Sequence, residues 1–201
     1  MKTIITVQHT ESVHHTNGHA GAWGNWPLTE LGRKQAFKIG EWLLREGCNE
    51  GDVMYCSDLE RAVQTAEEIN KSLQLTPVFS EMIREVNAGE GNGKPWEWFD
   101  AHKIPCDGYS VDYKPFADGE SDRELWNRLL PFYNSVMESQ DERILIVSHG
   151  TALSFLQSML MGYSLEDIER FRFRGRSGSV SRFTIEDSGK VVADYINMRI
   201  Y

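Results

Sequence analysis

The chain has 201 residues and a formal net charge of −9, a length that suits one domain with a sizeable core. Charged residues make up 25% and aromatic residues 11%, as in ordinary globular proteins. The acidic balance argues against nucleic acid or an anionic membrane as partner. No apolar run approaches the roughly twenty residues of a membrane span, and the first run, at 3–7, is too short for a secretion signal.

The three cysteines are odd in number, far apart and without a CxxC pair: Cys48, Cys56 and Cys106. Disulfide frameworks need paired cysteines and an oxidising compartment, so we expect a cytoplasmic protein. Cys56 ends an apolar run and is expected to be a small core residue.

Short apolar runs rich in β-branched residues predict buried strands at 3–7, 52–56 and 143–147. Each is followed by polar residues and then by a helical pattern, with a longer loop after the first. The tail after about 180 reads as two strands joined by the turn Asp187-Ser188-Gly189. This order predicts an α/β fold with a mostly parallel central sheet flanked by helices on both faces.

Four helices have recognisable starts. Thr29 opens the first, which Gly47 terminates, and Ser57 with Glu60 has the spacing of a capping box for a second helix to about Leu73. A third runs from Ser121 to about 138, with a kink expected at its internal proline, and a fourth begins at 150–151.

Between about 87 and 119 the periodic pattern fails, and the segment holds Gly, Pro and six aromatic residues. Long irregular segments in compact domains are usually functional, so we expect a single domain, 1–201, with a cap insertion at about 87–119 over the carboxyl edge of the strands. The alternative is a surface loop packed on its own aromatics.

Candidate site residues follow the three predicted strands. Gln8 and His9 come after the first strand, Arg61 one helical turn past the second, and His149 and Gly150 after the third. Carboxyl ends of parallel strands share one edge, where ligands of open α/β sheets bind. Two helix N-termini also point there, so the pattern predicts a phosphate site. Each histidine could instead be structural, and Arg61 could be a surface partner of Glu60 or Asp58.

Six segments carry a family resemblance: QHTES (8–12), PLTELGRKQA (27–36), SDLERAVQTA (57–66), IRE (83–85), DGES (118–121) and VSHG (147–150). Together they resemble the histidine phosphatase superfamily of phosphoglycerate-mutase-like enzymes. The resemblance implies a phosphatase that hydrolyses a small phosphomonoester through a phosphohistidine on His9, without cofactor or metal. It makes Arg61 a phosphate-binding residue, His149 the second histidine and Glu85 the proton donor.

The chain departs from that pattern inside the phosphate shell, which is expected to hold Gln8, His15 and Gly150. The family's first motif reads Arg-His-Gly where this chain has Gln8-His9-Thr10, and His15 stands where the family has Asn. A neutral amide cannot replace a guanidinium charge. We therefore form the hypothesis that His15, protonated when phosphate is bound, supplies part of the missing charge.

Two further patterns have a functional and a structural interpretation. His14, His15 and His19 could hold a metal, although their spacing is irregular and no Cys or carboxylate pair joins them. In 170–176, arginines alternate with aromatics; a solvated strand face is favoured over an arginine that reaches the substrate. A non-catalytic binder of a phosphorylated ligand is the rival function, and a mutase is favoured less; substrate and oligomeric state stay open.

Overall fold

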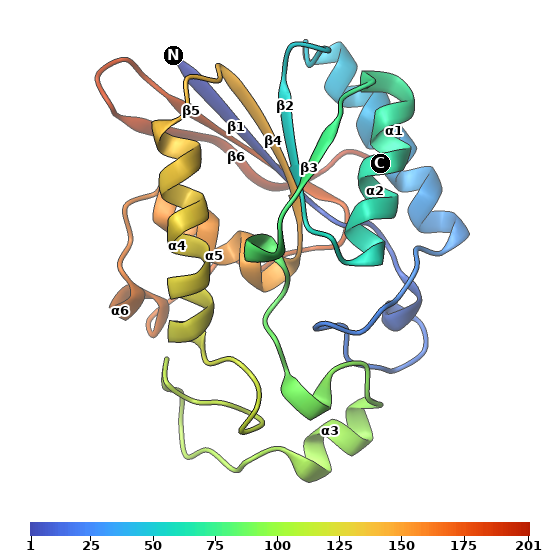
Figure 1. Ribbon diagram of the computed structural model, residues 1–201, viewed down its shortest axis with the longest axis vertical. Helices are drawn as coiled ribbons and strands as arrows, with labels where there is room; N and C mark the ends of the chain where they lie inside the picture. The colour runs from blue at the N-terminus through green and yellow to red at the C-terminus, as the bar shows by residue number, and fades with distance from the viewer.

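The computed structural model describes residues 1–201, and its centre is one six-stranded sheet in the order β3-β2-β4-β1-β5-β6 (Figure 1). Neighbours in the half β3-β2-β4-β1 run parallel, whereas β5 and β6 are antiparallel, so the predicted mostly parallel sheet and the terminal hairpin are confirmed. The strands are β1 (Lys2–Gln8), β2 (Val53–Cys56), β3 (Pro77–Phe79), β4 (Arg143–Ser148), β5 (Ser179–Ile185) and β6 (Val191–Arg199).

The helices are α1 (Glu30–Arg45), α2 (Glu60–Leu73), α3 (Trp96–His102), α4 (Asp122–Glu138), α5 (Gly150–Leu160) and α6 (Leu165–Ile168), with 3₁₀ turns η1 (Val13–His15), η2 (Glu81–Ile83) and η3 (Gly89–Gly91). Thr29 caps α1 by accepting the amide hydrogen of Gly32, and Ser121 forms a reciprocal capping box with Glu124 at α4. The capping box predicted from Ser57 is wrong, because Leu59 is the N-cap of α2 and its side chain makes no cap bond.

Helices cover both faces of the sheet, with α1 and α2 on one face and α4 and α5 on the other (Figure 1). Successive residues of β1 belong to different cores, as alternation along a strand requires: Ile4 packs with residues of α4 and α5, and Ile5 with residues of α1 and α2. Gly40 permits the close approach of α1 and α2, since a Cβ there would lie 2.6 Å from the Ile69 carbonyl oxygen.

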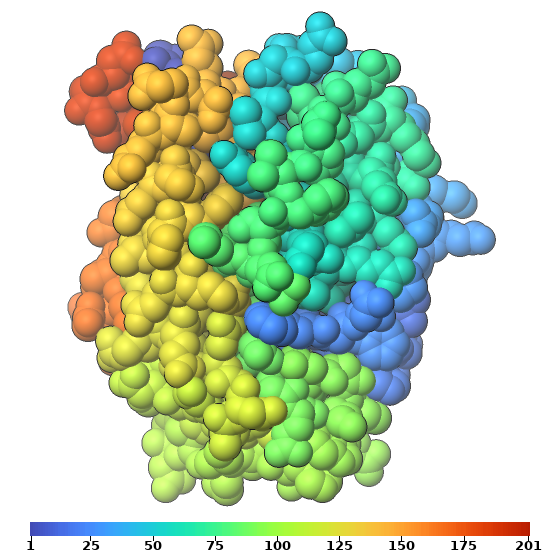
Figure 2. Space-filling model, viewed as in Figure 1, coloured from blue at the N-terminus to red at the C-terminus, as the bar shows by residue number.

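The segment 87–119 lies at one end of the molecule, beyond the carboxyl ends of the parallel strands (Figure 1). It is less irregular than its sequence predicts, because it contains η3 and α3. Backbone bonds tie it to the N-terminal loop, from Ala20 N to Lys94 O (2.8 Å) and from Trp96 N to Gly18 O (2.9 Å). Figure 2 shows this green-to-yellow segment packed below the blue N-terminal loop. No helix has the length and apolarity needed to cross a membrane.

Candidate active site

Three strand ends bring the predicted catalytic residues together. β4 lies between β1 and β2, so His9 after β1, His149 after β4 and Arg61 in the first turn of α2 meet at one edge. The rings of His9 and His149 are 5.2 Å apart between centroids, and Arg61 Nε lies 3.2 Å from His9 Nε2. The predicted convergence of these residues is therefore present in the structure.

The His9 ring has a defined tautomer. Its Nδ1 lies 2.9 Å from the Thr10 carbonyl oxygen, which can only accept, so Nδ1 carries the hydrogen and Nε2 keeps its lone pair. Burial and the nearby Arg61 charge hold the pKa of His9 well below its ordinary value. His9 is thus a neutral imidazole with its unprotonated nitrogen at the site.

Arg61 is a buried cation, with 1% of its surface exposed. Its NH1 and NH2 donate to the carbonyl oxygens of Gly24 (3.0 Å) and Ala22 (2.7 Å), and no carboxylate pairs with it. Burial lowers its pKa to about 10, which Glu85 partly offsets, so it stays charged at neutral pH. The alternative of a surface partner for Asp58 is wrong, since Asp58 pairs with Arg84.

His149 turns one nitrogen toward Ser57, whose Oγ lies 2.8 Å from His149 Nε2. Ser57 Oγ also accepts the amide hydrogen of Leu59 (3.4 Å). The other ring nitrogen, Nδ1, is buried without a protein partner. Burial, followed by the charge of Arg61, lowers the pKa of His149 well below its usual value.

The Glu85 carboxylate lies at the N-terminus of α5, where the sequence predicted that phosphate binds. Its carboxylate accepts the amide hydrogens of Thr151 (3.0 Å) and Ala152 (3.2 Å) at the start of α5, and that of Val86 (2.9 Å). Those donors are therefore unavailable to phosphate, and the prediction of an open helix end at α5 is corrected. Gly150 still lines the cavity, as does Glu85.

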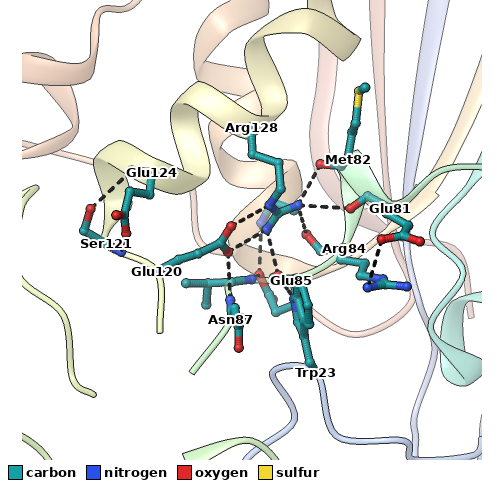
Figure 3. A network of polar contacts seen from close by, with 12 residues as sticks. Trp23, Glu81, Met82, Arg84, Glu85, Asn87, Glu120, Ser121, Glu124 and Arg128 are labelled. Carbon is teal, nitrogen blue, oxygen red and sulfur yellow. Dashed lines mark hydrogen bonds and ion pairs between the residues drawn. The ribbon is translucent and has the colours of Figure 1, made fainter. Parts of the chain in front are cut away.

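Arg128 of α4 holds the segment that carries Glu85. Its guanidinium donates to the carbonyl oxygens of 81, 82, 84 and 85 and pairs with Glu120 at 2.6 Å (Figure 3). Trp23 Nε1 donates to the same Glu85 carbonyl oxygen at 2.7 Å, and the Arg84 guanidinium lies 4.8 Å from the Trp23 ring centroid. Helix α4 and the N-terminal loop thus fix the backbone at Glu85.

Gln8 and His15 both line the cavity, as predicted for the phosphate shell. The Gln8 side chain is 8% exposed, and its Oε1 is buried without a partner. His15 Nδ1 accepts the amide hydrogen of Ser12 (3.1 Å), so the hydrogen of the neutral ring is on Nε2. Partial burial and Arg61 lower the pKa of His15. This geometry argues against a protonated His15, because protonation would break the bond to Ser12.

The histidine cluster differs from the one considered as a metal site. Ring nitrogens of His9, His14 and His15 lie within 4.8 Å of one another, and His19 is not among them. His15 Nδ1 accepts from Ser12, and His9 Nε2 faces the Arg61 guanidinium, whose Nε lies 3.2 Å away. A metal ligand needs a free lone pair, and a dication beside Arg61 would be repelled, so the cluster fits a metal poorly.

Most of these groups line a cavity of about 870 Å³, whereas His149 is fully buried beneath it and is not part of the lining. Its outer wall combines the cap residues Trp96, Phe99 and Pro115 with the segment 172–175. The arginine-aromatic segment 170–176 forms no strand, so the favoured interpretation of a solvated strand face is wrong. Irregular backbone instead turns Arg172, Phe173 and Arg174 to the cavity.

The open α/β sheet carries a histidine pair and an arginine at its carboxyl edge, an arrangement whose chemistry suits a phosphoryl group. The model of the histidine phosphatase superfamily (branch 1) matches residues 4–198, and the chain belongs to this superfamily.

Two relatives illustrate the range of the superfamily. A Hydrogenobacter thermophilus protein named "Putative phosphoserine phosphatase 2" is 32% identical over 84% of this chain and 83% of its own length. A Yersinia pestis protein named "Probable phosphoglycerate mutase GpmB" is 28% identical over 98% of this chain and 91% of its own.

Solved structures share the fold. A mycobacterial glucosyl-3-phosphoglycerate phosphatase superposes with a TM-score of 0.81 at 19% identity, covering 98% of this chain and 99% of that one. The α-ribazole phosphatase from Shigella flexneri gives 0.79 at 24% identity, covering 98% and 96%.

Three contacts of the site were not predicted from the sequence: the Ser57 bond to His149, the contact of His14 with His9, and the bonds of Arg128 to residues 81–85. Ser57 does stand at a strand end, and that position was the available signal, but its capping spacing favoured another role. Nothing in the sequence around Arg128 indicates its target, which lies 43 residues away at Glu85.

Proposed function

We propose that the protein is a phosphatase that hydrolyses a small phosphomonoester through a phosphohistidine on His9. One observation carries the proposal: the unprotonated Nε2 of a neutral, buried His9 lies 3.2 Å from the Nε of a cation, Arg61, that has no carboxylate partner. A nucleophilic lone pair beside an uncompensated charge fits an electrophilic phosphorus carried by an anion.

The reaction has two displacements. His9 Nε2 forms a bond to phosphorus while the bond to the leaving oxygen breaks, and that oxygen takes a proton. Water then attacks the phosphohistidine, which releases phosphate and restores the neutral imidazole. Arg61 offers its remaining N–H groups to the phosphoryl oxygens, and His149, whose ring centroid lies 5.2 Å from that of His9, contacts the same phosphoryl group.

The phosphate shell is proposed to contain Gln8, His15 and Gly150. Gln8 takes the position of the family's arginine and donates through its amide, and His15 donates through Nε2 as a neutral ring. The shell then holds one strong cation, Arg61, and several neutral donors. We expect such a shell to bind phosphate more weakly than one with two guanidinium groups.

Glu85 is proposed as the proton donor to the leaving oxygen. The carboxylate lines the cavity, and only N–H donors contact it in this structure. Donation requires one oxygen to leave the start of α5 and take up a proton when substrate enters. The backbone hold of Arg128 and Trp23 keeps the residue in place during that change.

The reaction is proposed to need no metal, because Arg61 supplies positive charge beside His9 Nε2 and would repel a dication there. A non-catalytic binder is the second candidate, and the missing first-motif arginine favours it. Against it stands the pairing of a poised nucleophile with Glu85, which a binder does not require. A mutase is disfavoured because it must exclude water, and exposed residues such as Trp96 and Arg174 form part of the cavity wall.

Small phosphorylated metabolites are the proposed substrates, and the names of the relatives narrow the first choices. Phosphoserine and phosphoglycerate each carry a carboxylate near the phosphoester, and both belong in the first screen.

The test is steady-state hydrolysis of p-nitrophenyl phosphate and a metabolite panel, with and without a chelator. We expect turnover that His9→Ala abolishes and the chelator leaves unchanged. Tight binding of phosphoesters without His9-dependent turnover would identify the binder, and phosphoryl transfer to a second substrate hydroxyl would identify a mutase.

A further inference from the structure

Three arginines line the cavity, and they differ in what they already bind. Arg61 lies buried at its base, where it contacts His9. Arg172 is committed: its NH2 lies 2.5 Å from Asp122 Oδ2 and 2.6 Å from the Tyr109 hydroxyl. Arg174 is exposed and lines the cavity, and its guanidinium makes no hydrogen bond or ion pair with the protein. Arg174 is therefore the arginine of the cavity whose charge has no partner within the protein.

The backbone beside Arg174 is anchored close to the nucleophile. The Gly178 amide hydrogen is shared between the carbonyl oxygens of Gln8 (3.2 Å) and His9 (3.1 Å), and Asn197 Nδ2 donates to the Arg174 carbonyl oxygen at 2.8 Å. Gly175 lies directly against Gly150, since a Cβ on it would be 2.8 Å from the Gly150 Cα. The Arg174 side chain, which makes no bond to the protein, can move to meet a ligand while its backbone stays fixed.

We propose that Arg174 binds a carboxylate carried by the substrate, so that the enzyme prefers phosphomonoesters with a carboxylate a few bonds from the phosphoester. This inference rests on the proposed function and specifies its substrate class. The phosphoryl group lies against His9 and Arg61, and the carboxylate reaches outward to the segment 172–175. A guanidinium fork matches a carboxylate with two parallel hydrogen bonds.

A second phosphate fits less well than a carboxylate. Glu85 and Glu120 also line the cavity, and the chain has a net charge of −9. One free guanidinium balances a single negative charge in those surroundings, whereas a phosphate group brings nearly two. The outer subsite therefore matches a monoanion.

Two pairs of substrates isolate the effect of the carboxylate. O-Phosphoserine is O-phosphoethanolamine with an added carboxylate. 3-Phosphoglycerate is glycerol 3-phosphate with a carboxylate in place of one hydroxymethyl group. We expect wild type to prefer the carboxylate member, and Arg174→Gln to reduce that preference in kcat/KM by about 10- to 100-fold. The kcat/KM of the members without a carboxylate should change little. Arg174→Lys should keep part of the preference, and Arg176→Gln, which alters an arginine outside the cavity lining, should keep all of it.

Binding to His9→Ala by calorimetry gives the same comparison without turnover, so the failure of catalysis is distinguishable from the failure of this subsite. The proposal is overturned if wild type shows no preference in either pair. It is also overturned if Arg174→Gln weakens both members of a pair equally, or if Arg176→Gln has the same effect as Arg174→Gln.

Discussion

At the residue scale, the role of Glu85 can be tested through the leaving group. If Glu85 protonates the leaving oxygen, Glu85→Gln should lower kcat for an alkyl phosphate by about 10²- to 10⁴-fold, because an alkoxide leaves poorly without a proton. Nitrophenolate leaves without one, so p-nitrophenyl phosphate should lose far less. An equal loss for both substrates would show instead that Glu85 only caps α5.

His15 provides the second residue-scale prediction. Since Ser12 N–H occupies its Nδ1, His15 acts as a neutral donor that an amide can replace. His15→Asn should change kcat/KM less than about tenfold, within the worth of one hydrogen bond, and leave the pH profile in place. A profile whose alkaline limb moves in the variant would restore the hypothesis that a protonated His15 supplies charge.

The neutral His9 sets the acid limb of the profile. Its pKa lies below the ordinary value of 6.5 because of burial and Arg61, and the nucleophile is active only when unprotonated. As pH falls, activity should therefore persist below pH 6.5 and decline only at the depressed pKa. Measurements of the hydrolysis rate of p-nitrophenyl phosphate from pH 4 to 8 check this. A decline in activity centred at pH 6.5 or above would contradict it.

The main residues of the site could be predicted from the sequence because they stand at strand ends, whereas the contacts between them could not. His9, Arg61 and His149 were predicted because three parallel strands share one edge. The contact of Glu85 with the N-terminus of α5 was not predictable. It joins residues that are 66 apart, and Glu85 itself lies in an irregular segment with no periodic pattern.

At the element scale, Arg128 joins α4 to the segment 81–85. Arg128→Ala leaves four carbonyl oxygens and Glu120 without their donor, so we expect the free energy of unfolding to fall by about 2–4 kcal/mol. Arg123→Ala on the same helix removes an exposed pair with Asp112 and should cost less than about 1 kcal/mol. Urea titrations compare the two variants. Equal decreases in the free energy of unfolding would show that Arg128 stabilises the fold no more than an exposed ion pair does.

Helices and strands with a clear hydrophobic period could be predicted from the sequence, whereas the short ones could not. Apolar runs predicted β1, β2 and β4, and caps predicted α1 and α4. β3 has three residues and α3 has seven, too few for a hydrophobic period to show. The interpretation of 170–176 failed for another reason: alternation indicated a strand, whereas tethering to β1 and β6 leaves this segment irregular.

At the scale of the whole molecule, stability should fall as the solution becomes acidic. Burial lowers the pKa of His9, His149 and His14, the last to about 3. Unfolding frees these rings to take up protons below pH 6.5, so the unfolded state binds more protons and the free energy of unfolding decreases as pH falls. The urea midpoint should therefore be lower at pH 5 than at pH 7.

His14→Asn should make that decrease smaller, because it removes one of the groups that take up protons. His102→Asn, which removes an exposed ring on α3 far from the buried cluster, serves as the matched histidine control. A midpoint that is constant between pH 7 and pH 5 would show that the buried rings do not titrate on unfolding.

The central claim is that His9 carries the phosphoryl group during turnover. Alkaline quenching of the enzyme while it hydrolyses a ³²P-labelled phosphoester, followed by peptide mapping, tests it most directly, since phosphohistidine survives alkali and is lost in acid. We predict acid-labile label on the peptide that contains His9, absent from His9→Ala. Turnover without that label, or with label on another residue, would contradict the account.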